Sequence, residues 1–244
     1  AAQITCEAFR SLGPIIREAK SELHCARLLE AQFAALGADG TSFTTIIASG
    51  KHATTLHHRP THSPLWKREL VLIDAGARYK GYPADVTRTF PASGKFSPAQ
   101  AAAYDVVLEA KNQVEKKIRA GITMDELQEI CVRELTRGLR ELRIISTPLP
   151  KAIADGEYKP FFMHRIGHYL GIDVHDIAPR RLDARGIAQA QYSLPLPAGC
   201  MITVEPGLYF DPRDQDLPKE FRGVGIRIED DVLVTSTGSE VLTA

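Results

Sequence analysis

Acidic residues stand inside apolar segments of this sequence that otherwise have the character of buried β-strands. Asp74 closes the run Val-Leu-Ile, and Glu205 closes the run Met-Ile-Thr-Val. Aspartate is depleted in strands, and a buried carboxylate is costly unless it is paired or binds a cation. A chain with several such residues must therefore fold so that something compensates their charge.

A third acid lies in a segment that pairs with the first. The segments 70–77 and 84–90 are rich in strand-forming residues and flank a glycine-containing turn, so they predict a β-hairpin. If the turn is centred between residues 79 and 80, Asp74 faces Asp85 across the hairpin. We therefore expect these two carboxylates to lie close together.

Glu229 is a fourth acid in an apolar setting, because it follows Gly-Ile-Arg-Ile and precedes two acids and Val-Leu-Val. Four carboxylates that converge repel one another, and divalent cations would resolve the repulsion. One histidine with four carboxylates suits ions such as Mn²⁺, Co²⁺ or Zn²⁺. Two ions that share carboxylates lie ~3.5–4 Å apart, a spacing that activates a water between them. The candidate ligands are Asp74, Asp85, His168, Glu205 and Glu229.

Each candidate ligand alone also has an ordinary interpretation. A strand aspartate often caps a backbone amide at a turn, and the side chains of Glu205 and Glu229 can simply be exposed to solvent. A single histidine such as His168 is often a hydrogen-bonded core residue. The prediction of a metal centre therefore depends on the set, not on any one member.

The rest of the sequence predicts an α+β fold in which antiparallel pairing dominates. Ser97-Pro98 and the capping box at 123–126 mark two helix starts. We assign these two helices to covering a sheet. Predicted helices span about 21–36, 97–119 and 123–139; further strands span 42–49, 200–205 and 225–234; and loops span 148–160 and 178–197.

Composition argues against several other classes. The formal net charge is zero, so nothing attracts the whole chain to nucleic acid or an anionic membrane. No apolar stretch approaches the ~20 residues that span a bilayer. The four cysteines form no C-x-x-C pair, which excludes a zinc ribbon and favours free thiols in a reducing cytoplasm.

The order and spacing of the five candidate ligands resemble the pita-bread metallopeptidases of family M24. That family contains methionine aminopeptidases, prolidases and aminopeptidase P. The resemblance covers nearly the whole chain, through LVLIDAG, GYPADVTRTFPASGKFSPAQ, PFFMHRIGHYLGIDVHD, TVEPGLYF and FRGVGIRIEDDVLVT. The His-x-x-x-His motif at 164–168 and the following histidine resemble the proline-specific branch, closest to aminopeptidase P with prolidase as a near neighbour.

This resemblance implies a curved, mostly antiparallel sheet covered by helices, in a single catalytic domain over residues 1–244. Proline-specific members carry an additional N-terminal domain, which we expect this chain to lack. The implied cofactors are two divalent ions, foremost Mn²⁺, with Co²⁺ or Zn²⁺ as alternatives. Asp74 is then a ligand of one ion, and His168 and Glu205 are ligands of the other. Asp85 and Glu229 contact both ions or one on each side.

The resemblance also implies a mechanism and a substrate. A hydroxide that bridges the two ions attacks the bond before a proline in the second position of a peptide, and Glu205 shuttles the proton. His57, His164 and His175 match the histidines that face the substrate. Arg227 shares a strand face with Glu229 and either binds a substrate carboxylate or supports the acids. For His52, His58 and His62 we expect only exposed loop positions.

Two features depart from the family pattern. Arg165 stands where glycine is usual, so it either narrows the pocket or binds a peptide carboxylate. The segment 179–196 replaces a shorter, glycine-containing loop. The oligomeric state is open, and a homo-oligomer is one option.

Three alternatives to an aminopeptidase P-like enzyme remain at this point. The first is a prolidase, which cleaves Xaa-Pro dipeptides. The second is a metal-free enzyme acting on a small C–N compound, and the third is a non-catalytic peptide-binding module. Because all five candidate ligands are retained, the sequence argues against the metal-free enzyme and the peptide-binding module.

Overall fold

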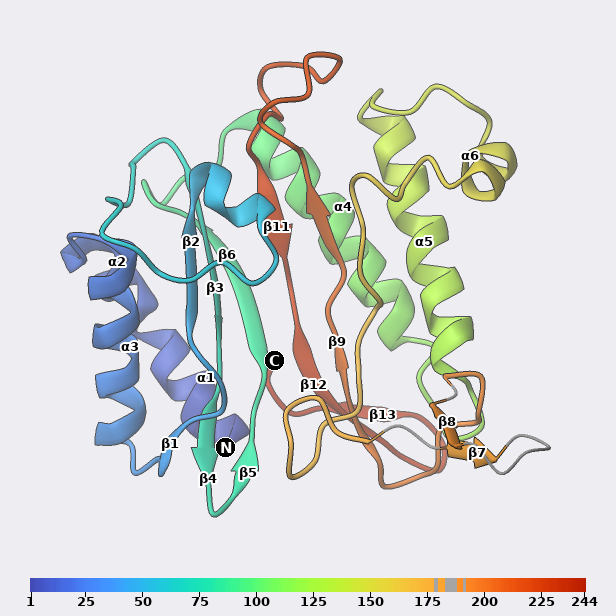
Figure 1. Ribbon diagram of the computed structural model, residues 1–244, viewed down its shortest axis with the longest axis horizontal. Coiled ribbons are helices and arrows are strands. Elements are labelled where there is room, and N and C mark those ends of the chain that lie inside the picture. Colours follow the sequence, from blue (N-terminus) through green and yellow to red (C-terminus); the bar gives the residue numbers. More distant parts are fainter. Residues whose placement is uncertain (178–179, 183–187, 191) are drawn as a thin grey trace.

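The computed structural model describes residues 1–177, 180–182, 188–190 and 192–244. Figure 1 shows a curved layer of strands with helices behind it and to its sides, and both termini lie in its lower half. The predicted α+β class is confirmed, with every strand pair antiparallel among the described residues. The helices are α1 (Ala2–Arg10), α2 (Leu12–Glu18), α3 (Glu22–Ala35), α4 (Pro98–Glu115), α5 (Met124–Glu141) and α6 (Leu149–Asp155), with the 3₁₀ turn η1 (Gly50–Thr54).

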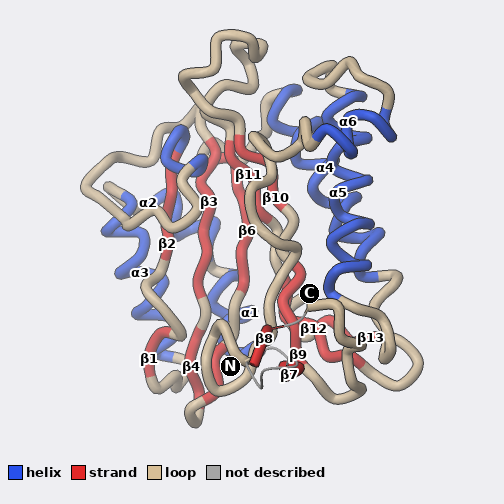
Figure 2. Tube along the Cα trace, turned by 45° about the vertical axis from the view of Figure 1, so that its right-hand side comes forward, coloured by secondary structure: helices blue, strands red, loops and turns tan. Residues whose placement is uncertain are grey.

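The strands form several short sheets that follow one another across the molecule (Figure 2). In one half, β3 pairs with β2 on one side and β6 on the other; in the other half, β12 lies between β9 and β13. The strands are β1 (Gly40–Thr41), β2 (Ile46–Ser49), β3 (Leu70–Ala75), β4 (Ala77–Tyr79), β5 (Tyr82–Pro83), β6 (Val86–Pro91), β7 (Arg180–Leu182), β8 (Ala188–Ala190), β9 (Met201–Val204), β10 (Gly207–Tyr209), β11 (Gly225–Arg227), β12 (Asp230–Val234) and β13 (Ser239–Val241).

Side chains of β3 alternate between the hydrophobic core and the opposite face of the sheet. Val71 and Ile73 pack into the cluster that helices α1, α2 and α3 form with the sheet. Leu72 faces the other side, where it contacts a second small cluster that includes Tyr209. Because side chains alternate along a strand, Asp74 shares the face of Leu72, away from these helices.

The hairpin has a different register from the one expected with a turn centred between residues 79 and 80. Asp74 pairs with Thr87, and the turn is the two-residue pair Lys80-Gly81. Both turn residues have positive φ, at 51° and 85°, which is the backbone of a type I′ hairpin turn. Asp85 therefore lies two residues before Thr87, on the same face, and remains beside Asp74.

Gly76 lies between β3 and β4, where the chain passes close to its hairpin partner. A Cβ added there would stand 1.7 Å from the carbonyl oxygen of Ala84, the residue before Asp85. We expect Gly76→Ala to lower the free energy of unfolding by about 2–3 kcal/mol, because backbone must move to relieve the overlap. Urea denaturation measures this, with Gly40→Ala as control because nothing lies within 4 Å of its added Cβ. Equal stability of the two variants would contradict it.

The helix starts predicted from capping signals are confirmed. Ser97 and Thr123 each form a complete capping box, at the starts of α4 and α5. The expected loop at 148–160 is wrong in its first half, where α6 begins after Pro148. Pro150 lies in the first turn of this helix, where a proline loses no hydrogen bond that the helix would otherwise make.

The expected strand 225–234 is divided into β11 and β12. The first part pairs with β10 and the second with β9, so the chain changes partners at Glu229.

All four cysteines are free thiols, as expected. Among the described residues, no helix combines the length and apolar character required to cross a bilayer.

Candidate metal centre

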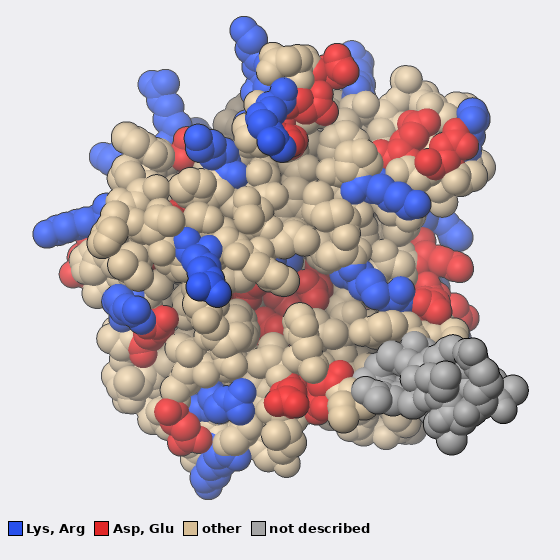
Figure 3. All heavy atoms as spheres, viewed as in Figure 1, with Lys and Arg blue, Asp and Glu red and all other residues tan. Residues whose placement is uncertain are grey.

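Two triads of side chains with metal-ligand spacing lie at the middle of the concave face. In each triad the candidate ligand atoms lie within 4.8 Å of one another. Glu229 belongs to both, and Figure 3 shows acidic side chains gathered in the hollow of this face. The two triads that share Glu229 are Asp74, Asp85 and Glu229, and His168, Glu205 and Glu229; Asp85, His168 and His175 form a third group with the same spacing. All five candidate ligands predicted from sequence are thus brought together.

Hydrogen bonds between two backbone segments position His168 and Glu205 of the second triad. The segment around His168 runs beside β9: Thr203 N–H donates to the carbonyl of His168 at 2.8 Å, and Glu205 N–H donates to that of Ile166 at 2.7 Å. The His168 N–H donates to the Thr203 hydroxyl at 3.1 Å. His168 and Glu205 therefore leave adjacent backbone segments, and their Nε2 and Oε1 atoms lie 3.6 Å apart.

The first triad is held by Arg227, which the sequence analysis singled out, and by Thr87 and Asp231, which it did not. The Thr87 hydroxyl donates to Glu229 Oε2 at 2.6 Å. Arg227 Nε donates to that same hydroxyl at 3.1 Å, while its Nη2 donates to Asp74 Oδ2 at 2.5 Å. The backbone N–H of Asp85 donates to both carboxylate oxygens of Asp231, at 3.2 Å each. Arg227 thus fulfils one predicted alternative, support of the acids.

The electrostatics of this cluster favour a cation. Burial, followed by the charges of Glu229 and Asp74, raises the pKa of Asp85 well above its ordinary value. Burial and Glu229 do the same to the pKa of Glu205, and burial and Asp74 raise the pKa of Glu229 to about 7. One oxygen of Asp74, Oδ1, is buried without a hydrogen-bond partner among the described residues. The donor set therefore fits divalent ions, which would compensate the charges and occupy that orphan oxygen.

A pocket of about 620 Å³ opens onto the two triads. All three predicted substrate-facing histidines line it, together with Arg165 and Tyr192. His57 is exposed, and the ring of His175 lies 4.1 Å from that of His168, centroid to centroid. Such a volume accommodates a short peptide.

His164 is linked to Arg227 through Tyr209, a residue that sequence reasoning missed. Its Nδ1 lies 2.8 Å from a backbone carbonyl, and its Nε2 lies 2.9 Å from the Tyr209 oxygen, which also accepts from Arg227 Nη1 at 3.0 Å. Burial, followed by the charge of Arg227, lowers the pKa of His164 to about 4. The neutral ring then donates from Nδ1 and accepts the Tyr209 proton at Nε2, so its tautomer is fixed.

Arg165 lies at the wall of the pocket, but its charge is already engaged. Its guanidinium donates to Asp125 and stands 4.3 Å from the centre of the Tyr192 ring. Of the unusual segment 179–196, residues 179, 183–187 and 191 lie outside the described residues. Strands β7 and β8 pair within it.

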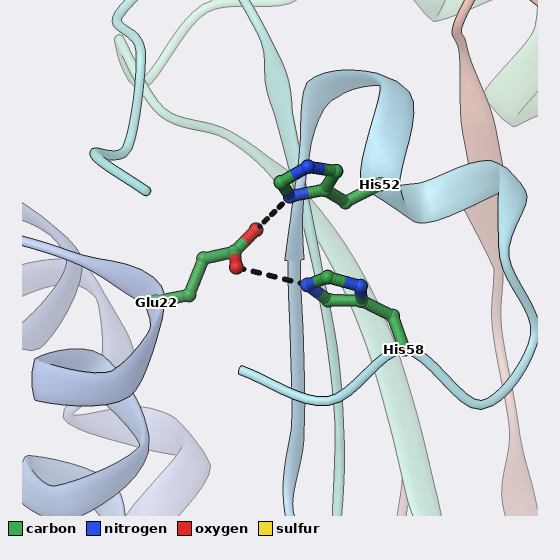
Figure 4. A group of neighbouring side chains, drawn as sticks. All are labelled: Glu22, His52 and His58. Atoms are coloured by element: carbon green, nitrogen blue, oxygen red, sulfur yellow. Dashed lines mark hydrogen bonds and ion pairs between the residues drawn. The ribbon is translucent and has the colours of Figure 1, made fainter. Parts of the chain in front are cut away.

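Two histidines expected to be exposed loop residues have a different environment. His52 and His58 both hydrogen-bond to the buried carboxylate of Glu22, so that expectation is wrong for them (Figure 4). Their side chains are only 29% and 13% exposed. The expectation failed because Glu22 lies far away in sequence, on the first turn of α3. His62 is exposed, as expected.

Comparisons with known proteins agree on one group. The sequence profile of metallopeptidase family M24 matches residues 1–236. The chain is 40% identical over 244 residues to a Xaa-Pro aminopeptidase of Escherichia coli, covering 100% of this chain and 53% of that protein. It is 35% identical to Xaa-Pro aminopeptidase 3 of Rattus norvegicus, covering 100% of this chain and 46% of that one.

Solved structures give the same result. The fold matches aminopeptidase P from E. coli with the inhibitor Pro-Leu at a TM-score of 0.91 and 39% identity, covering 100% of this chain and 54% of that chain. It matches proline aminopeptidase P II from Yersinia pestis at a TM-score of 0.89 and 39% identity, with the same coverage. The chain thus spans about half the length of the relatives it matches.

Proposed function

The chain belongs to metallopeptidase family M24, which confirms the expected pita-bread fold, and we propose that it is a metal-dependent exopeptidase that removes the residue before a penultimate proline. The observation that carries the proposal is the pair of triads sharing Glu229 at the floor of a peptide-sized pocket. The names of the relatives support the preference for proline.

The ligand roles follow from the two triads. Asp74, Asp85 and Glu229 would hold one cation, and His168, Glu205 and Glu229 the other. Two divalent cations, when bound, supply an activated water and polarise the scissile carbonyl. Because Asp85 Oδ2 also lies 3.4 Å from His168 Nε2, Asp85 is placed to serve both sites.

Glu205 is suited to carrying a proton. It is partly exposed to the pocket, unlike Glu229, and its pKa is raised by burial and by Glu229. It would take the proton released during attack and deliver it to the leaving nitrogen of the proline. His164 Nδ1 lies 3.8 Å from Glu205 Oε2, close enough to influence that transfer.

The histidines and Arg227 would position the peptide. His57 and His175 line the pocket and can donate a hydrogen bond to the carbonyl oxygen as its charge develops. Arg227 and Tyr209 hold His164 in one tautomer, and Arg227 fixes Asp74. The free amine of the substrate would lie near Asp74, which explains removal of a single N-terminal residue.

We also propose Mn²⁺ as the native cation, a reducing cytoplasm as the location, a homo-oligomer as an option, and residues 1–244 as one catalytic domain. The mixed carboxylate and imidazole set supports Mn²⁺, with Co²⁺ or Zn²⁺ as alternatives. The free thiols support the compartment. No feature of the described residues favours a nucleic-acid or membrane partner.

Paired substrates distinguish aminopeptidase from prolidase. With Mn²⁺ added, we expect kcat/KM for a tripeptide Xaa-Pro-Xaa to exceed that for the dipeptide Xaa-Pro by at least about 10-fold, since the pocket of about 620 Å³ has room for a residue after the proline. Release of the N-terminal amino acid measures both rates, and Xaa-Ala-Xaa is the control for proline preference. Cleavage of dipeptides alone would establish the prolidase reading instead. If wild type binds peptides but cleaves none of them, the binding-module reading gains support.

A further inference from the structure

A second cluster of titratable side chains lies outside the candidate metal centre, around the carboxylate of Glu22. Glu22 is completely buried and occupies the first turn of α3. Figure 4 shows the rings of His52 and His58 approaching its two oxygens from the same side. This cluster shares no residue with the triads of the metal centre.

The Glu22 carboxylate accepts five hydrogen bonds. Oε1 accepts from the Ser49 N–H at 2.9 Å and from His52 Nδ1 at 2.7 Å. Oε2 accepts from His58 Nε2 at 2.9 Å and from the N–H and hydroxyl of Thr61 at 3.0 and 2.8 Å. Since a carboxylate can only accept, both imidazoles must present an N–H to it.

The ionised form of Glu22 suits this arrangement. Burial alone would raise the pKa of Glu22, but the hydrogen bonds from His58, Ser49 and His52 outweigh it and hold the pKa below its ordinary value. The two rings stack on each other with centroids 4.4 Å apart and planes 24° apart. The cluster therefore has a single well-defined geometry.

All five donors belong to one stretch of chain, residues 49–61, which contains η1 and the loop after it. Backbone bonds join the same stretch to α3, because Leu23 N–H donates to the Thr61 carbonyl at 2.9 Å. This stretch carries His57 into the pocket. None of the hydrogen bonds among the described residues involves the side chain of His57, so its position depends on its neighbours.

Those neighbours are fixed on both sides. Leu56 packs against the small core cluster that includes Leu72 and Tyr209. His58 is bonded to Glu22. We propose that Glu22 is a positioning residue for the peptidase reaction: through His52, His58 and Thr61 it holds the loop that presents His57 to the substrate. This inference rests on the proposed function.

The same three side chains have the spacing of a metal site, but the donor pattern favours a hydrogen-bonded anchor. Oε1 already accepts two hydrogen bonds and Oε2 accepts three. Metal content therefore belongs in the test. A third cation per chain in wild type, lost on replacing His52, would overturn the anchor.

The test is a double-mutant cycle between Glu22→Gln and His57→Ala. We expect Glu22→Gln to lower kcat for an Xaa-Pro-Xaa tripeptide by about 10–100-fold with little change in KM, as for a reacting group displaced by an ångström. In the His57→Ala background the same change should cost less than about 3-fold, because its effect passes through His57. An equal loss in both backgrounds would overturn the proposal. Glu30→Gln is the matched control, since Glu30 lies on the same helix and, among the described residues, forms its one ion pair with the exposed Arg27.

Hydrogen exchange at the amides of residues 49–61 tests the anchor without activity. We expect Glu22→Gln to speed exchange of the Ser49 or the Thr61 amide by at least about 10-fold, because these N–H groups donate to different oxygens of the carboxylate and glutamine keeps only one of them. Unchanged exchange would overturn the anchor, whereas failure of wild type to cleave any peptide would overturn the proposed function alone. If Glu22→Gln does not fold, Thr61→Val removes one of the five donors and serves in both measurements.

Discussion

Glu229→Gln is expected to remove both cations and to lower kcat/KM for an Xaa-Pro-Xaa tripeptide by at least about 10³-fold, the scale of losing a preorganised charge at a reacting centre. The reason is geometric. Glu229 belongs to both triads, so no cation in either keeps a full set of anionic ligands without it. Glutamine preserves its size and can still accept from Thr87, so loss of fold does not explain the result.

The variant Asp74→Asn distinguishes a ligand of one cation from a ligand that two cations share, because Asp74 belongs to only one triad. Metal analysis after reconstitution should give one cation per chain for Asp74→Asn and fewer than one for Glu229→Gln. Glu240→Gln is the control, since Glu240 is an exposed residue on β13. If Glu229→Gln keeps two cations and activity within about 3-fold of wild type, the shared-ligand assignment is wrong.

Local sequence signals determined the parts of the fold that depend on local contacts. Ser97 and Thr123 cap helices because their hydroxyls reach a backbone N–H three residues away, so the chain nearby contains all that the motif requires. The register of the hairpin was harder to predict from the sequence. It depends on whether Lys80 accepts a positive φ beside Gly81, and a non-glycine residue there gives a weak signal.

The residues of the candidate site likewise fall into two groups: those that the sequence alone predicts and those that it does not. The four acids could be predicted because several carboxylates in apolar segments form a conspicuous set, and His168 could be predicted because it completes the family pattern. Thr87, Tyr209 and Glu22 could not, because threonine in a strand, tyrosine after a proline-glycine turn and glutamate in the first turn of a helix are all ordinary. Their roles come from partners distant in sequence: Thr87 meets Glu229, and Glu22 meets His58.

The stabilisation of the chain by cations should depend strongly on pH. Glu229 has a pKa near 7 in the folded chain without metal, against an ordinary value of 4.5. A raised carboxyl pKa contributes stability that is fully present below 4.5 and is lost as pH rises through about 7. For this group the loss is on the order of 3 kcal/mol, and Asp85 and Glu205 shift in the same direction.

Bound cations reverse this loss because they stabilise the ionised carboxylates. We therefore expect the rise in Tm on adding Mn²⁺ to chelator-treated protein to be small near about pH 5 and to reach about 6–12 °C near about pH 8. His164 opposes the trend in the absolute Tm, because its pKa is lowered to about 4 and its contribution is lost as pH falls. His164 is not a proposed ligand, so its contribution is common to both samples and cancels in the difference.

Differential scanning calorimetry of paired samples measures that difference directly. Glu229→Gln should flatten the pH dependence, because the variant has no carboxyl proton to release at this position. A cation-dependent rise in Tm that is the same at both pH values would contradict the assignment of these buried acids as ligands. Such a result would place the bound ion among groups that are already ionised at pH 5, and the surface carboxylates fit that description better than Asp85, Glu205 and Glu229.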